Sequence, residues 1–378
     1  MTDKLVNGEK KWYHKNMKTA IFGGAFDPFH NEHLNIIIAA HKAGCDRVVV
    51  VPSFLPPHKE KLFSSYEARR EMVASGTEGL PYVIIDDIER ERGTTNPTSV
   101  ILPILKQKYG DCVFLMGGDS VKNFHTWIDP QKIADATTLA VVRRGGVGNF
   151  YDDVERLKKD YGARVEILPY EGKRVSSSAV KAAVELGADT DDISSAVKKT
   201  IEKSGLYRQF GSLVERVRED VPERTFRHCA STVIYGEDFA GVNRLSYEEV
   251  FIACLLHDCA KHLAVKMEGV PAPVVHQFVG ADRARERYGV EDINILNAIR
   301  YHTSGKPSMT QLEKLVFSAD MLEPNRNFEG VEELRAIMDN DFEEGFRACV
   351  NATYSHLISK GGEIYPLTKE CAEYYNNI

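Results

Sequence analysis

The residues Gly23-Gly24-Ala25-Phe26-Asp27-Pro28-Phe29-His30-Asn31-Glu32-His33 follow a short apolar run, residues 19–24, and overlap the start of a helix-like segment, residues 33–43. A strand, a glycine pair and a helix start in this order place backbone N–H groups and a helix N-terminus beside two imidazoles. This combination suits the phosphates of a nucleotide. The string therefore predicts a phosphate-binding turn between a strand and a helix.

Strand-like and helix-like segments alternate through the first half of the chain. The expected strands are residues 19–24, 47–51, 83–88, 112–116 and 138–142, and further helices are expected at 65–75, 100–109 and 151–161. Strands separated by helices form a parallel sheet with right-handed crossovers. We therefore expect an α/β, Rossmann-like, doubly wound parallel sheet.

The pattern changes in the second half, where strand-like runs vanish and apolar residues recur at helical spacing, as in residues 247–263, 292–301 and 312–322. This half is expected to be all α. A length of 378 residues also favours two domains. We expect a polar leader over residues 1–16, an α/β domain over 17–208 and a helical domain over 209–378.

Composition narrows the class of protein. Hydrophobic residues make up 43% and charged residues 27%, and no apolar run is long enough to span a bilayer. The leader lacks the apolar stretch of a signal peptide, so we expect a cytoplasmic protein without a membrane partner. Seven cysteines without a CxxC pair indicate neither a disulfide framework nor a structural zinc site. The net charge of −7 argues against a general nucleic-acid binder, although local sites can still bind nucleotides.

A second group of chemically active residues lies in the helical half. The dyad His257-Asp258 lies within the predicted helix over residues 247–263, which opens with a capping box at Ser246 and Glu249. Further imidazoles and a carboxylate follow or precede it at long intervals: His228, His276, His302 and Asp320. A helical bundle can bring such residues together as metal ligands, and nitrogen and oxygen donors without thiolate suit iron, manganese or zinc. Spacing alone leaves scattered surface or core histidines as an equal alternative.

The first string, Gly23 to His33, resembles the phosphate-binding motif of the nucleotidylyltransferase superfamily, and its details resemble bacterial nicotinate-nucleotide adenylyltransferases. Four later segments match that family in order: residues 51–59, residues 66–69, Gly117-Gly118-Asp119-Ser120 with Trp127, and residues 175–181. Pantetheine-phosphate adenylyltransferases and cytidylyltransferases share the first motif but not the later segments, and they stay as alternatives.

This resemblance implies adenylyl transfer from ATP to nicotinate mononucleotide, which gives deamido-NAD and pyrophosphate, with Mg²⁺ accompanying ATP. His30 and His33 would hold the triphosphate and stabilise the leaving pyrophosphate. The other nucleotide-binding residues that the resemblance implies are Gly23, Gly24, Phe26, Lys59, Thr98, Gly117, Asp119, Trp127, Ser177 and Ser178. The structural alternatives are a turn residue for Asp119, a core residue for Trp127 and a helix cap for Ser177.

The chain also departs from that family at four positions. Glu32 stands in place of a glycine, Pro97 falls in a segment that is usually Ser-Tyr-Thr, Arg144 replaces a proline and Lys181 replaces an arginine. These changes bear on substrate choice and rate rather than on the fold. We expect Glu32 to point to solvent, because the first turn of a helix favours an acidic residue there.

Three strings in the second half, residues 257–261, 298–305 and 318–326, resemble the HD phosphohydrolase superfamily and, in detail, bacterial symmetrical diadenosine tetraphosphatases. The resemblance covers about residues 213–376 and implies hydrolysis of diadenosine tetraphosphate to two ADP at two metal ions, with iron expected first and manganese or zinc as alternatives. His228, His257, Asp258 and Asp320 would bind one metal, and His276 with His302 would complete a second site that shares Asp258.

The same resemblance makes Lys261 a catalytic candidate and places Arg300 and Arg326 on the substrate phosphates. Ordinary solvated charge is the structural alternative for these three cations. Together the two resemblances predict a bifunctional enzyme whose partners are small nucleotides. Two further hypotheses stay open: the HD domain hydrolyses another nucleotide polyphosphate, or one domain is a non-catalytic nucleotide-sensing module. The sequence leaves the oligomeric state open.

Overall fold

The computed structural model of the chain describes residues 17–55, 63–144, 150–361 and 364–376, without the side chains of Asp119 and Arg144. The expected polar leader, residues 1–16, therefore lies outside the described residues. Across these described ranges, no helix combines the length and the apolar character needed to cross a bilayer.

The first half is built on one sheet of parallel strands. Its order is β3-β2-β1-β4-β5-β6, which is the doubly wound order expected from the sequence. The strands are β1 (Thr19–Gly24), β2 (Arg47–Pro52), β3 (Val83–Ile85), β4 (Cys112–Gly117), β5 (Thr138–Arg144) and β6 (Val165–Gly172). The order reverses between β1 and β4, and the carboxyl ends of these two strands open the crevice in which such folds bind ligands.

Alternate residues of each central strand enter two separate cores, one on each face of the sheet. Ala20 and Phe22 pack with the helices of one face, whereas Ile21 packs with those of the other. The first face carries α1 (Asn31–Lys42), α2 (Tyr66–Gly76), α8 (Ser177–Glu185) and α9 (Ser195–Ser204). The second carries α3 (Ile88–Arg92), α4 (Thr98–Tyr109), α5 (Gly118–Lys122), η1 (Phe124–Thr126), α6 (Pro130–Ala136) and α7 (Phe150–Tyr161).

Two details of the sheet differ from the sequence-based expectation. The strand β6 was not predicted, because Pro169 interrupts its apolar pattern; proline is tolerated here since β6 is an edge strand. The expected strand over residues 83–88 ends at Ile85, and Ile88 instead opens α3.

The second half is helical throughout its described residues, as expected. Its helices are α10 (Gly211–Asp220), α11 (Glu223–Ala240), α12 (Tyr247–Leu256), α13 (Ala272–Tyr288), α14 (Ile293–Tyr301), α15 (Gln311–Leu322), α16 (Val331–Asn340), α17 (Phe342–Lys360) and α18 (Pro366–Asn376). One prediction was wrong in detail. The helix expected over residues 247–263 ends at Leu256, so His257 is its C-cap and the dyad lies at the helix end rather than inside it.

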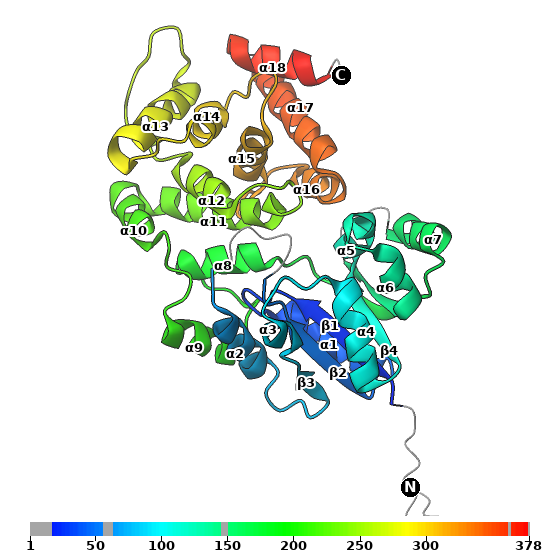
Figure 1. Cartoon of the computed structure of the whole chain (residues 1–378). Coiled ribbons are helices and arrows are strands. Elements are labelled where there is room, and N and C mark those ends of the chain that lie inside the picture. Colours follow the sequence, from blue (N-terminus) through cyan, green and yellow to red (C-terminus); the bar gives the residue numbers. More distant parts are fainter. Residues whose placement is uncertain (1–16, 56–62, 145–149, 362–363, 377–378) are drawn as a thin grey trace, which may run out of the picture.

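The two halves meet along α8. This helix packs against α11, and Figure 1 shows α8 between the sheet and the helices of the second half. Ala182 and Leu186 belong to the core of the helical half, while Val180 of the same helix belongs to a core of the sheet. One helix is therefore shared by the cores of both halves.

Candidate active sites

The first candidate site lies at the carboxyl ends of β1 and β4. Gly23 and Gly24 end β1 and line a pocket together with Thr98, Ser120 and Trp127. A Cβ atom on Gly24 would lie 3.0 Å from the Phe26 ring, so a larger residue at this turn would need the ring to move. The remaining wall is largely apolar, as suits a flat ring. Gly117, at the end of β4, adjoins this crevice.

The two histidines of the motif bind each other's backbone at the start of α1. His30 is the N-cap, and its Nδ1 accepts the N–H of His33 at 3.4 Å, while Nδ1 of His33 accepts the N–H of His30 at 3.2 Å. The rings stack with centroids 3.6 Å apart. Because each Nδ1 is an acceptor, each neutral ring carries its proton on Nε2, which makes both side chains hydrogen-bond donors suited to a phosphate.

A second helix N-terminus lies beside this motif. Ser176 is the N-cap of α8, its Oγ accepting the N–H of Ala179 at 3.0 Å, and the hydroxyl of Ser177 donates to the carbonyl of Pro28 at 3.3 Å. The cap is thus Ser176 rather than Ser177. Ser177 and Ser178 lie in the first turn of α8, where helix N–H groups favour anions.

Glu32 does not point to solvent, so that expectation was wrong. Its side chain is buried, and the hydroxyl of Tyr170 donates to both carboxylate oxygens, each at 3.0 Å. Asn35, one turn further along α1, donates to the same carboxylate at 3.4 Å. Burial together with the bond to Glu32 raises the pKa of Tyr170 to about 12. The hydrogen bonds from Tyr170 on β6 outweigh the preference of a carboxylate for solvent. Glu32 therefore links α1 to the sheet.

The other candidates in this half fall into three groups. Thr98 opens α4 behind Pro97, and both line the pocket with Trp127. Phe26 is buried among Phe22, Phe29 and His33, so its observed role is packing under the motif. Lys59 and the side chain of Asp119 lie outside the described residues.

Asp27 is a residue of the motif to which the sequence analysis gave no role. Its carboxylate accepts hydrogen bonds from the hydroxyls of Ser64 and Tyr207 and from the N–H of Phe63, and the ammonium of Lys181 lies 4.0 Å away. The position of Asp27 inside the glycine-histidine string was the available signal. Through these contacts the carboxylate of Asp27 fixes the turn between Gly24 and His30.

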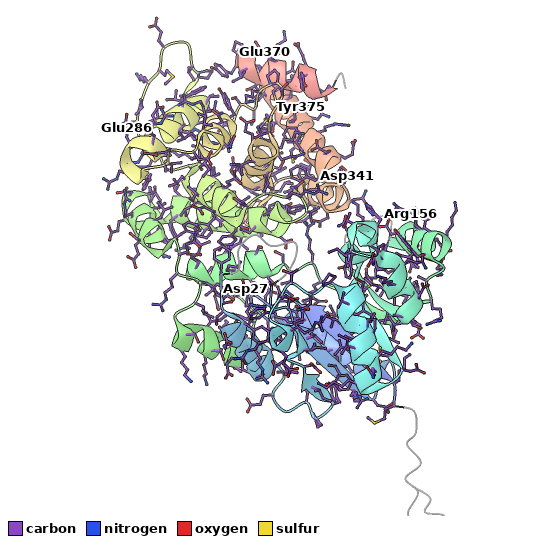
Figure 2. All side chains as sticks on the ribbon, in the orientation of Figure 1. Asp27, Arg156, Glu286, Asp341, Glu370 and Tyr375 are labelled. Atoms are coloured by element: carbon purple, nitrogen blue, oxygen red, sulfur yellow. The ribbon has the colours of Figure 1, made fainter. Side chains whose placement is uncertain are left out.

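Lys181, the residue that stands in place of the family's arginine, lies at the junction of the two halves. It is 4% exposed, and its ammonium lies 3.8 Å from the ring centroid of Phe63 and 4.6 Å from that of Tyr247 on α12. Figure 2 labels Asp27 on the side of the sheet that faces the helical half. The departure at position 181 therefore lies at a contact with the second half.

The second candidate site gathers all six predicted metal ligands. His228 lies on α11 and His276 on α13, Asp320 is on α15, and His257 and His302 are the C-caps of α12 and α14, with Asp258 following His257. The Nε2 atom of His228 lies 3.1 Å from that of His257 and 2.8 Å from Oδ1 of Asp320. The Nε2 atoms of His276 and His302 are also 3.1 Å apart.

Asp258 lies between these two groups of ligands. Its Oδ2 is 3.7 Å from Nε2 of His228 and 3.6 Å from Nε2 of His257, whereas Oδ1 is 3.2 Å from His276 and 3.5 Å from His302. The side chain is 1% exposed, and Oδ1 accepts no hydrogen bond of good geometry from the described residues. A buried carboxylate oxygen of this kind is costly. The donor set therefore fits a divalent cation on each side of Asp258.

The imidazoles are oriented by bonds at their other ring nitrogen. Nδ1 of His257 lies 2.7 Å from the carbonyl oxygen of Cys254, and Nδ1 of His302 lies 2.7 Å from that of Ile299. A carbonyl accepts only from N–H, so both rings carry the proton on Nδ1 and leave the Nε2 lone pair for a metal.

The carboxylates and imidazoles also shift each other's pKa. Burial lowers the pKa of His228, but hydrogen bonds to Asp320 and Glu323 outweigh it and raise the pKa to about 9. Burial alone would raise the pKa of Asp258, yet the surrounding imidazoles hold it well below its usual range. The carboxylates of this cluster are thus ionised, and their negative charge stabilises positive charge held by the neighbouring imidazoles.

Two of the three predicted phosphate-binding cations lie at this cluster. Lys261 Nζ is 2.6 Å from Oδ2 of Asp258, and Arg326 pairs with the carboxylate of Asp320 and donates to its carbonyl at 2.8 Å. Arg300 instead pairs with Asp282 on α13 at 2.7 Å. Lys261, His276 and Asp320 line a pocket whose other walls include Leu263, Val265, Pro273, Val279 and Thr303.

A doubly wound sheet with a glycine-histidine phosphate turn, joined to a helical bundle with a histidine-aspartate ligand cluster, defines a two-domain enzyme of the nucleotide-binding and metal-binding classes. The cytidylyltransferase-like family matches residues 21–183, and the HD domain family matches residues 225–325.

Three relatives are similar to this chain, one over most of its length and two over one half of it. A protein of Mycoplasma genitalium, named as a probable nicotinate-nucleotide adenylyltransferase/Ap4A hydrolase, is 26% identical over 82% of this chain and 89% of its own length. A symmetrical bis(5'-nucleosyl)-tetraphosphatase of Bacillus subtilis is 32% identical over 40% of this chain and 89% of its own length. A probable nicotinate-nucleotide adenylyltransferase of Serratia proteamaculans is 28% identical over 50% of this chain and 94% of its own length. The chain belongs to the family that fuses a nicotinate-nucleotide adenylyltransferase-type domain to an HD domain of the symmetrical tetraphosphatase type.

Proposed function

We propose that the chain is a bifunctional enzyme of nucleotide metabolism. Residues 17–208 transfer the adenylyl group of ATP to nicotinate mononucleotide, and residues 209–378 hydrolyse diadenosine tetraphosphate symmetrically to two ADP. The observation that carries the proposal is the presence in one chain of a nucleotide crevice at the β1–β4 reversal and of a ligand cluster centred on Asp258, in a family whose members bear these two names.

In the first half, the phosphate of the mononucleotide attacks the α-phosphorus of ATP and pyrophosphate leaves. No protein nucleophile is needed, so positioning and charge stabilisation carry the catalysis. The Nε2–H groups of His30 and His33 and the first turns of α1 and α8 face the triphosphate in this proposal. Mg²⁺ that accompanies ATP supplies further charge neutralisation.

The pyridine mononucleotide occupies the apolar part of the same pocket. Trp127 lies edge-on to Phe114, with centroids 6.1 Å apart, which fixes the orientation of its ring at the pocket wall. Thr98, at the first turn of α4, offers a hydroxyl and a helix N–H to the substrate. Lys59, Gly117 and Asp119 remain proposed nucleotide contacts on the strength of the resemblance.

In the second half, His228, His257 and Asp320 lie close enough together to hold one metal ion. His276 and His302 would hold a second ion, and Asp258 faces both groups of ligands. Nitrogen and oxygen donors without thiolate suit iron, manganese or zinc, and iron is the metal that the resemblance leads us to expect first. Such metals, when bound, neutralise phosphate charge and activate water. Lys261 and Arg326 contribute positive charge for the phosphate chain at the same cluster.

The alternatives are not favoured. A non-catalytic first domain would be favoured if the Glu32 carboxylate repelled the phosphates, but this carboxylate is bound by Tyr170. The second domain keeps its complete ligand set, and its named relatives are tetraphosphatases. All seven cysteines are free and buried, which supports a reducing cytoplasm as the location.

Assays on the full-length chain test both activities. ATP with nicotinate mononucleotide should give deamido-NAD and pyrophosphate, and diadenosine tetraphosphate with added Fe²⁺, Mn²⁺ or Zn²⁺ should give ADP as the sole nucleotide product. Formation of ATP and AMP would contradict symmetrical cleavage. If the chain hydrolysed another nucleotide polyphosphate faster, that compound rather than diadenosine tetraphosphate would be the substrate.

A further inference from the structure

One ligand of the metal cluster is oriented differently from its neighbours. Nδ1 of His257 and of His302 each meet a carbonyl oxygen three residues earlier in their own helix. His228 lies in the first half of α11, and its Nδ1 meets a carboxylate instead, Oε1 of Glu323 at 3.1 Å. Glu323 follows the ligand Asp320 by three residues and was not singled out in the sequence.

Glu323 is itself held in place from several sides. Its side chain is 2% exposed, and its second oxygen, Oε2, accepts the N–H of Asn325 at 2.7 Å. Its backbone N–H donates to the carbonyl oxygen of Ala319 at 3.0 Å. The carboxylate therefore presents Oε1 to His228 in a fixed direction.

We infer that Glu323 is a positioning residue of the metal site: it accepts a hydrogen bond from the Nδ1–H group of His228 and so holds the Nε2 atom of that ring toward Asp320 and His257. The inference rests on the proposed metal-dependent activity of this half. It adds a residue that contacts neither metal nor substrate and acts through His228.

The chemistry of the acceptor gives the inference a specific consequence. A carboxylate acceptor makes an imidazole a stronger donor to a metal than a neutral carbonyl does, and loss of such an outer partner typically weakens metal binding about 10–100-fold. Only the group formed by His228, His257 and Asp320 has this anionic support among the described contacts. The two metal positions are therefore unequal, and a change at Glu323 acts on one of them.

A competing explanation is that Glu323 serves only the turn after α15. Arg335 provides a matched control, because it donates to the carbonyls of Leu322, Glu323 and Arg326 and so supports the same turn without touching His228. Arg335→Met should lower the melting temperature while leaving metal binding unchanged.

The experiment is a titration of the metal-stripped full-length chain with Co²⁺, followed by visible absorption and by competition with a chelator. Glu323→Ala should weaken one of two metal equivalents about 10–100-fold and alter the absorption of that equivalent. Glu323→Gln keeps an oxygen acceptor of the same reach but loses its negative charge, so it should weaken the same equivalent by less than Glu323→Ala does. Adenylyl transfer by each variant reports that the chain is folded.

The inference would be overturned if Glu323→Ala bound both Co²⁺ equivalents with wild-type affinity and absorption. In that case only its melting temperature would be lowered, as in Arg335→Met. If Glu323→Ala does not fold, Glu323→Gln decides alone: a weakened single equivalent supports the positioning role, and unchanged binding refutes it. Failure of the wild-type chain to bind Co²⁺ or to hydrolyse diadenosine tetraphosphate would instead refute the proposed function.

Discussion

The ammonium group of Lys181 on α8 lies 4.6 Å from the ring centroid of Tyr247 on α12, so a charged residue of the adenylyltransferase-type half is buried against the HD half. Tyr247 also donates a hydrogen bond to Glu185 of α8 at 3.3 Å. Both contacts belong to the helix whose first turn faces the phosphate motif. The domains are therefore joined by packed side chains, and the position of α8 depends on contacts with both domains.

Tyr247→Ala should destabilise the whole chain, because a buried aromatic ring that covers Lys181 is lost. The expected loss is about 3–5 kcal/mol, the range for aromatic-to-alanine changes in cores. Tyr247→Phe, which keeps the ring and removes one hydrogen bond, should cost about 1 kcal/mol. Denaturant unfolding of both variants checks this, and equal stability of Tyr247→Ala and wild type would show that the junction contributes nothing.

Glu32→Gly should lower stability rather than tighten ATP binding. The substitution leaves the Tyr170 hydroxyl without its carboxylate and places glycine in the first turn of α1, for an expected loss of about 1–3 kcal/mol. Glu32→Gln keeps one acceptor and should lose less. Thermal unfolding and titration with a non-hydrolysable ATP analogue separate the outcomes; a marked gain in affinity would mean that Glu32 repels the triphosphate.

His30→Ala should reduce adenylyl transfer far more than it weakens mononucleotide binding. Charge on the departing pyrophosphate grows in the transition state, and loss of one such donor typically costs about 10²–10³ in turnover. Steady-state kinetics with nicotinate mononucleotide and ATP give the measurement, with hydrolysis of diadenosine tetraphosphate as the internal control. Unimpaired turnover would refute the role given to His30.

Asp258→Ala should abolish hydrolysis of diadenosine tetraphosphate and remove bound metal, because Asp258 faces both groups of ligands. Adenylyl transfer should persist. The matched control is Asp282→Ala, which removes a carboxylate on α13 that pairs with Arg300 instead. Metal analysis and both assays are done on one preparation of each variant. Full metal content with retained hydrolysis in Asp258→Ala would refute the shared-ligand site.

Arg326→Ala and Arg300→Ala should differ, although the sequence suggested the same role for both. Arg326 contacts Asp320 in the ligand cluster, whereas Arg300 is paired with Asp282. A charge-assisted bond of about 1.5–3 kcal/mol corresponds to roughly 10–100-fold in KM for the dinucleotide on loss of Arg326. Arg300→Ala should change KM less. An equal or larger effect at Arg300 would place the phosphate chain on the other side of the cluster.

Much of the fold is encoded locally. Alternating strand and helix patterns predicted the parallel sheet, and the switch to helical spacing predicted the helical half, because each element's periodicity reflects which face it buries. The strand β6 was not predicted, because Pro169 breaks the local apolar pattern. Proline is nevertheless tolerated in this strand, since β6 lies at the edge of the sheet.

The site residues divide in the same way. The two resemblances proposed six metal ligands and two phosphate-binding histidines, and the structure brings the members of each set close together. The resemblance implied that two groups of ligands share Asp258, but the sequence could not show this geometry, because ligands from α11, α13 and α15 and from the ends of α12 and α14 meet only when the helices pack.

The sequence by itself determined the two folds, the motifs and the chemical nature of both sites. Only the tertiary structure decided that Glu32 turns inward to Tyr170, that Arg300 leaves the metal cluster for Asp282, and that Lys181 is buried under Tyr247. The physical reason is the range of the interactions: capping, periodicity and turn geometry act within a few residues of chain. The partner of a buried charge is chosen by whichever distant element packs against it.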